Sequence, residues 1–130
     1  MKKILIIHGQ VNIREYLADK LAAEGYLVVP IGKSSLAKEI ISTLCPDLIL
    51  LNLDEDKYGV FEEIKNQSPF LPILALMTWA SCRSDFCSSL DDVFVIKGLD
   101  FEGLPQKVAE VLQRQTVSLK THVKNCNLQI

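Results

Sequence analysis

The sequence lacks any apolar run long enough to cross a bilayer. Of its 130 residues, 48% are hydrophobic, yet no stretch approaches the roughly 20 apolar residues that a transmembrane helix needs. The basic and apolar start, Met1 to Ile7, is interrupted by polar residues from His8 onward, before a signal-peptide core is complete. We therefore expect a cytoplasmic chain with no membrane partner, and we interpret this start as a first strand.

Excess positive charge and paired cysteines are also missing. The formal net charge is −2, which argues against a nucleic-acid-binding surface of any size. The four cysteines form no Cys-x-x-Cys pair, and their irregular spacing fits neither a disulfide framework nor a zinc site. We interpret them as free thiols and expect no metal site built from them.

Short apolar runs alternate with helical patterns along most of the chain. The run at 47–52 opens on Asp47, closes on Asn52 and is apolar in between, which is typical of a strand buried on both faces of a parallel sheet. The strands expected on this basis are 3–7, 27–31, 47–52, 73–77 and 93–96. Alternating strands and helices in a chain of this length predict one α/β domain with helices on both faces of a parallel sheet.

Helices are expected between these strands. Apolar residues recur at helical spacing in four segments, namely 12–24, 34–44, 60–67 and 104–112. Asn12 is a candidate N-cap for the first helix, and Ser34 or Ser35 for the second. Residues 81–90 are the least informative part and allow at best a short helix.

Polar residues stand where the expected strands end. His8 and Gly9 follow the first strand, and Asn52, Thr78 and Lys97 end or follow the third, fourth and fifth. The carboxyl ends of parallel strands meet at one edge of a sheet, where ligand and reaction sites form, so these side chains should lie together. Their arrangement resembles the receiver domain of two-component response regulators.

The resemblance covers residues 2 to about 114 and implies a flavodoxin-like, CheY-like fold. Such a fold is a (βα)5 three-layer sandwich whose five parallel strands have the order 2-1-3-4-5. Pro30, which has no backbone N–H, would then lie on an edge strand, where proline is tolerated. The chain would consist of a receiver-like domain, 1–114, and a C-terminal tail, 115–130, that is a helix extension or an arm.

The positions that carry the chemistry of that family differ here. His8 and Gly9 occupy the place of the acidic pair that holds Mg²⁺, and Asn52 the place of the phospho-accepting Asp. Mg²⁺ prefers carboxylate oxygens, and an amide is no nucleophile, so we expect the metal and the acceptor both to be lost. Trp79 adds bulk where a small residue normally lies beside the phosphate. We therefore expect a degenerate pocket with no cofactor and no catalysis, and only Asp54 is left as a poor alternative acceptor.

Other positions match the pattern of the family. Thr78 corresponds to its hydroxyl residue, Lys97 to its invariant cation, and Phe94 to its switch aromatic. Thr78 and Lys97 are also compatible with ordinary strand-end roles. The output face of the family implies a partner surface at the fourth helix, the fifth strand and the fifth helix, near Phe94, Phe101 and Leu104.

Three functions follow from these observations. The preferred one is a phosphorylation-independent pseudo-receiver, a non-enzymatic interaction module in two-component or phosphorelay signalling. Its partner would be a kinase, an output protein or another receiver, and a homodimer stays open. The second is a receiver still phosphorylated at a non-standard acid such as Asp54. The third is a small-ligand binder on the same fold, but its phosphate cradle would need a glycine-rich loop, and the loop at 8–12 has a single glycine.

Overall fold

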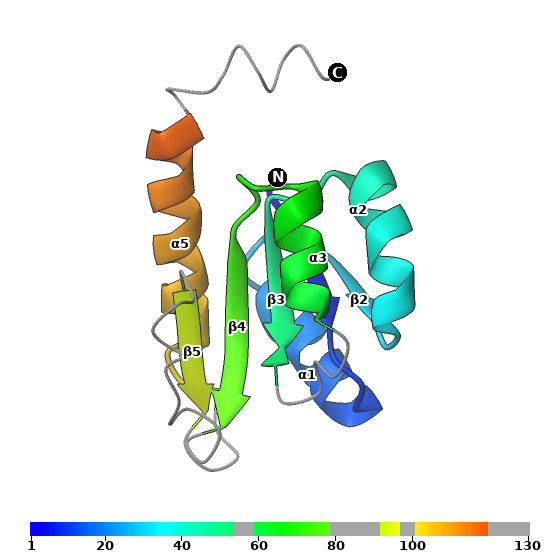
Figure 1. Ribbon diagram of the computed structural model, residues 1–130. Helices are drawn as coiled ribbons and strands as arrows, with labels where there is room; N and C mark the ends of the chain where they lie inside the picture. Colours follow the sequence, from blue (N-terminus) through cyan, green and yellow to red (C-terminus); the bar gives the residue numbers. More distant parts are fainter. Residues whose placement is uncertain (54–58, 79–91, 97–100, 120–130) are drawn as a thin grey trace.

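The protein forms a five-stranded parallel sheet in the order β2-β1-β3-β4-β5 (Figure 1). The structure is a computed structural model that describes residues 1–53, 59–78, 92–96 and 101–119. Its strands are β1 (Lys3–Ile7), β2 (Leu27–Ile31), β3 (Leu48–Asn52), β4 (Ile73–Thr78) and β5 (Asp92–Ile96). The predicted parallel sheet and its strand order are therefore confirmed.

Helices cover both faces of this sheet. One face packs against α1 (Val11–Ala22) and α5 (Leu104–Leu119), and the other against α2 (Ala37–Leu44) and α3 (Val60–Gln67) (Figure 1). A short 3-10 turn, η1 (Ser34–Leu36), leads into α2. The segment 81–90, for which we expected at best a short helix, lies outside the described residues. Among the described helices, none combines the length and the hydropathy that spanning a membrane would require.

The strand β3 lies in the middle of the sheet and is buried along its whole length. Successive side chains of a strand point to opposite faces, so Leu48 and Leu50 pack towards α1 and α5 while Ile49 and Leu51 pack towards α2 and α3. Both faces of β3 are thus core. This double burial explains why its sequence is continuously apolar instead of alternating.

The strand β2 forms one edge of the sheet, as Pro30 suggested. Pro30 lies opposite Ile6 of β1, and no described strand pairs with the other side of β2. A proline that cannot donate a ladder hydrogen bond is accommodated at such an edge. Just beyond β1, the backbone N–H of His8 donates to the carbonyl of Ile31 at 3.1 Å, which extends the β1–β2 pairing into the loop.

The predicted helix caps were wrong. The N-cap of α1 is Gln10 and that of α2 is Leu36, and neither makes a side-chain cap hydrogen bond. Asn12 lies inside the first turn of α1, because the helix begins two residues earlier than an Asn12 cap would place it. Ser34 and Ser35 both lie in η1, ahead of α2. The side-chain acceptor at the start of α1 is the His8 ring, whose Nδ1 accepts the Gln10 N–H at 3.1 Å.

The helix α5 continues to Leu119, past the expected boundary at 114. The first residues of the expected tail are therefore helical, in line with a helix extension. Residues 120–130 lie outside the described part of the chain, and the division into 1–114 and 115–130 stays a prediction.

Replacing Leu50 with Ala should destabilise the fold strongly. Leu50 is 0% exposed at the centre of the sheet, and truncation of such a leucine costs about 2–5 kcal/mol through lost burial and the cavity left behind. Leu27→Ala is the matched control, because Leu27 is 43% exposed and should cost about 1 kcal/mol or less. Urea unfolding of both variants measures the difference; equal losses would contradict the central position of β3.

Candidate functional site

The strands of the sheet end at its lower edge in Figure 1, and the candidate site lies there. His8 follows β1 and Asn52 closes β3; these two residues are 4% and 8% exposed, and they are the buried polar residues of the described chain. Thr78 closes β4 and is exposed. The structure therefore brings His8, Gly9 and Asn52 together as the sequence predicted, while Thr78 ends a neighbouring strand beyond them.

The side chains of His8 and Asn52 contact each other across the ends of β1 and β3. The distance between His8 Nε2 and Asn52 Nδ2 is 3.3 Å. The other ring nitrogen of His8 accepts the Gln10 N–H, so the proton of a neutral ring belongs on Nε2. The Nε2–H therefore donates, and it needs an acceptor on Asn52. The oxygen and nitrogen of a carboxamide have nearly the same shape, so a rotated Asn52 amide places its oxygen at this contact. The pair is thus a neutral hydrogen bond between an imidazole and an amide.

A small cavity of about 40 Å³ opens beside this pair. The residues that line it share a position at the carboxyl ends of β1, β2 and β3 or at the starts of the segments that follow. They are Ile7, His8, Gly9, Gly32, Ser34, Leu51, Asn52 and Val60. None of them is acidic. The cavity offers polar contacts from an imidazole, a carboxamide and a hydroxyl.

Arg14 of α1 closes one side of this region. Its Nη1 donates to the carbonyl of His8 at 2.7 Å, and its guanidinium lies across Gly32. A Cβ at position 32 would stand 2.5 Å from Arg14 Nη1, so only glycine leaves room for this arrangement. The role of Arg14 was not predictable from the sequence, because its partner is a backbone carbonyl and no motif marks that contact.

The described residues His8, Gly9 and Asn52 do not suit Mg²⁺. A hard divalent cation takes oxygen ligands, preferably carboxylates, in near-octahedral geometry. His8 offers a nitrogen whose lone pair is already engaged, Gly9 has no side chain, and Asn52 offers a neutral amide. Within the part of the chain that the structure describes, no group of three or more His, Cys, Asp or Glu residues could hold a metal ion. His8, Gly9 and Asn52 therefore do not supply the carboxylate ligands that a receiver uses to bind its metal.

The other predicted site residues have different outcomes. Asp54, Trp79 and Lys97 lie outside the described residues, so their roles in the degenerate pocket stay predictions. On the expected interaction face, Phe94 is half-buried, while Phe101 is 6% and Leu104 0% exposed.

Phe101 and Leu104, near which the partner surface was expected, are themselves buried. Both belong to the core between α1, α5 and the sheet, and the Phe101 ring contacts Tyr16 of α1 with the ring centroids 5.9 Å apart. Leu104 begins the apolar stripe of α5 that turns towards the sheet. These two side chains can support an interaction surface from beneath but do not form one.

The protonation of His8 gives a direct test of the hydrogen-bond arrangement. We expect the neutral tautomer with the proton on Nε2, because Nδ1 accepts the Gln10 N–H. Long-range ¹⁵N–¹H NMR spectra at neutral pH distinguish the two ring nitrogens, and a His8→Gln variant assigns the signals, since the chain has two histidines. A proton on Nδ1 would contradict the arrangement.

Replacing Gly32 with Ala should displace Arg14 and weaken the fold by about 1–2 kcal/mol, the scale of a hydrogen bond to a charged group. The backbone at Gly32 is not in the left-handed region, so strain of the chain itself is not the cause. In an Arg14→Ala background the cost of Gly32→Ala should largely vanish, because the clashing group is gone. Urea unfolding of the four proteins in this cycle measures the coupling, and an equal cost in both backgrounds would refute it.

Two curated proteins are similar to the chain over most of its length. It is 30% identical over 137 aligned positions to a probable transcriptional regulator ycf27 of Cyanophora paradoxa, an alignment that covers 99% of the chain and 56% of that protein. It is 31% identical over 117 positions to a ycf27 protein of Cyanidium caldarium, with coverages of 85% and 46%. The chain spans about half the length of these relatives. No sequence profile of a known protein family matches it.

A solved structure agrees with this relationship in sequence and in fold. The response regulator TrrA of Thermotoga maritima, crystallised with Mg²⁺ and BeF, is 29% identical, has a TM-score of 0.74, and is aligned over 85% of this chain and 99% of its own. TrrA has also been crystallised in complex with the histidine kinase ThkA. Together with the 2-1-3-4-5 sheet, these similarities show that the chain belongs to the receiver-domain family of response regulators.

Proposed function

We propose that this chain is a pseudo-receiver, a phosphorylation-independent and non-catalytic protein-interaction module in two-component or phosphorelay signalling. The observation that supports it most is Asn52 at the carboxyl end of β3, where a receiver carries its acceptor, held 3.3 Å from His8 at the end of β1. The pocket is built from the same strand ends as a working receiver, but its described polar groups are neutral.

The chemistry of phosphoryl transfer explains why this matters. Transfer needs a nucleophile in line with the phosphorus and a cation that neutralises the charge on the transferring oxygens. The lone pair of the Asn52 amide nitrogen is delocalised, so it is no nucleophile. His8 and Gly9 replace the carboxylates that would hold Mg²⁺. We therefore propose that Mg²⁺ binding is lost together with the phosphorylation.

A protein of a signalling pathway is the proposed partner. The crystal structure of TrrA with the kinase ThkA supports the view that a receiver of this fold docks onto another signalling protein. For this chain the partner would be a kinase, an output protein or a second receiver. The ycf27 relatives are called transcriptional regulators but are about twice as long. With a net charge of −2, this chain is itself proposed to bind protein and not nucleic acid.

Incubation with acetyl phosphate and Mg²⁺ should leave the mass of the protein unchanged. The expected result follows from the missing acceptor and metal ligands, and intact-protein mass spectrometry measures it. A gain of one phosphate that maps to Asp54 would instead support the alternative, a receiver phosphorylated at a non-standard acid.

A restored variant is the positive control. Asn52→Asp alone should take up little phosphate, because no metal ligands accompany it. Asn52→Asp combined with His8→Asp and Gly9→Asp should recover some Mg²⁺-dependent phosphorylation. If the triple variant folds and binds Mg²⁺ but the wild type is phosphorylated equally well, the proposed loss of function would be refuted.

A further inference from the structure

The cavity beside His8 and Asn52 has a chemistry that the proposed function does not use. It has a volume of about 40 Å³, and a single ordered water occupies about 10–15 Å³ by this measure. The space therefore takes roughly three water-sized groups. It is too small for a nucleotide or a flavin ring and of the right scale for a tetrahedral oxyanion.

A hydroxyl group in its wall has no partner in the described protein. Ser34 is half-buried and lines the cavity. It lies in η1, where no side-chain cap hydrogen bond is made, and no other described residue bonds to its Oγ. A hydroxyl can donate to an anion that enters the cavity. Asn52, 8% exposed, lines the same space with an amide group that can also donate.

A positive charge stands next to this wall, and no acidic side chain of the described residues forms an ion pair with it. The Arg14 guanidinium lies across Gly32 and donates to the His8 carbonyl, and both of those residues line the cavity. Among the described residues Arg14 has no acidic partner within ion-pair distance, and none of the residues that line the cavity is acidic. An uncompensated, half-buried guanidinium favours an anion in its neighbourhood, because the low dielectric strengthens the attraction.

We infer that this cavity is a non-covalent binding site for a small tetrahedral oxyanion such as inorganic phosphate or sulfate. Ser34 and Asn52 supply hydrogen-bond donors, and Arg14 supplies the charge. The described walls do not suit a cation, because none of the residues that form them carries a carboxylate. The inference is independent of the proposed interaction function, since it concerns reversible binding and no transfer of a phosphoryl group.

Titration of the ¹⁵N-labelled protein with sodium phosphate, at constant ionic strength in sodium chloride, tests the site. Two-dimensional NMR spectra should show saturable shifts of the amides of Gly32, Ser34 and Asn52, and sodium sulfate should produce the same pattern. Dialysis should reverse the shifts and leave the mass unchanged, which separates binding from phosphorylation. Shifts that stay linear, or that sodium chloride alone reproduces, would overturn the inference.

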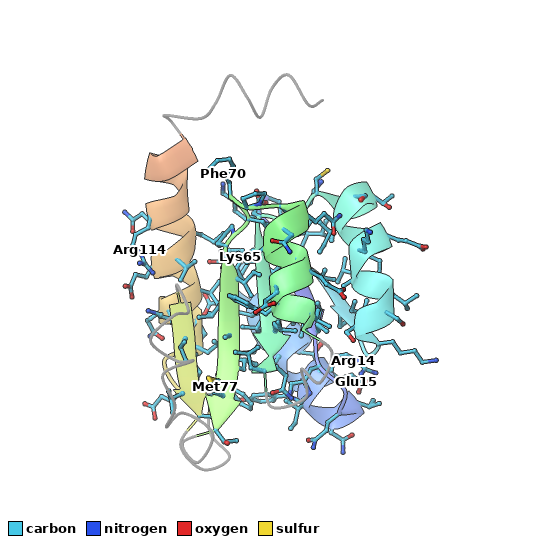
Figure 2. All side chains as sticks on the ribbon, in the orientation of Figure 1. Arg14, Glu15, Lys65, Phe70, Met77 and Arg114 are labelled. Carbon is cyan, nitrogen blue, oxygen red and sulfur yellow. The ribbon has the colours of Figure 1, made fainter. Side chains whose placement is uncertain are left out.

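Three variants localise the site. Arg14→Gln should weaken phosphate binding about tenfold, the scale of one charge-assisted hydrogen bond. Arg114→Gln removes the same charge from α5, on the opposite side of the molecule (Figure 2), and should leave binding unchanged. Ser34→Ala leaves every contact of Arg14 in place and should weaken binding several-fold, so it keeps the test decisive if Arg14→Gln does not fold. Equal losses in Arg14→Gln and Arg114→Gln, or no loss in Ser34→Ala, would count against the site.

Discussion

His8 is the residue on which the carboxyl edge of this sheet depends, because it uses each of its four polar groups. Its backbone N–H donates to Ile31 of β2 and its carbonyl accepts from Arg14 of α1. Its ring accepts the Gln10 N–H through Nδ1 and meets Asn52 of β3 through Nε2. One residue, through its backbone and its ring, thus connects the ends of β1 and β3, the start of α1 and the edge strand β2.

This set of bonds explains how a receiver-like pocket is stable with neutral groups at its centre. Carboxylates gathered at the same strand ends repel one another and lose hydration, and a bound cation offsets both costs. An imidazole and a carboxamide carry no net charge, and each satisfies a hydrogen bond of the other. The 4% and 8% exposure of His8 and Asn52 is therefore compatible with a folded domain that holds no metal between them.

Much of the fold could be predicted from the sequence, whereas only part of the site could. The continuous apolar run of β3 indicates that this strand is buried on both faces. Pro30 indicates that β2 is an edge strand. The caps Asn12 and Ser34 were wrong because α1 already begins at Val11, and because a 3-10 turn at Ser34–Leu36 precedes α2. Leu104 belongs to the apolar stripe of α5, and that stripe was already evidence for burial. The contact of Arg14 with a carbonyl across Gly32 left no trace in the sequence, because backbone partners have no residue-type signature.

The same bonds show why the pocket cannot regain its chemistry by one substitution. A carboxylate placed at position 52 would face the Nε2–H of His8, which satisfies it as a hydrogen-bond acceptor and competes with any metal for its lone pairs. Removing the His8 ring to free that carboxylate would in turn deprive the Gln10 N–H of its acceptor at the start of α1. The hydrogen bond that Arg14 donates to the backbone carbonyl of residue 8 would survive, because it does not involve the ring. The Arg14 cation would therefore stay beside the site where Mg²⁺ must enter. A metal-dependent pocket therefore requires simultaneous substitutions at the ends of β1 and β3, because the His8 ring and the Asn52 amide stabilise each other.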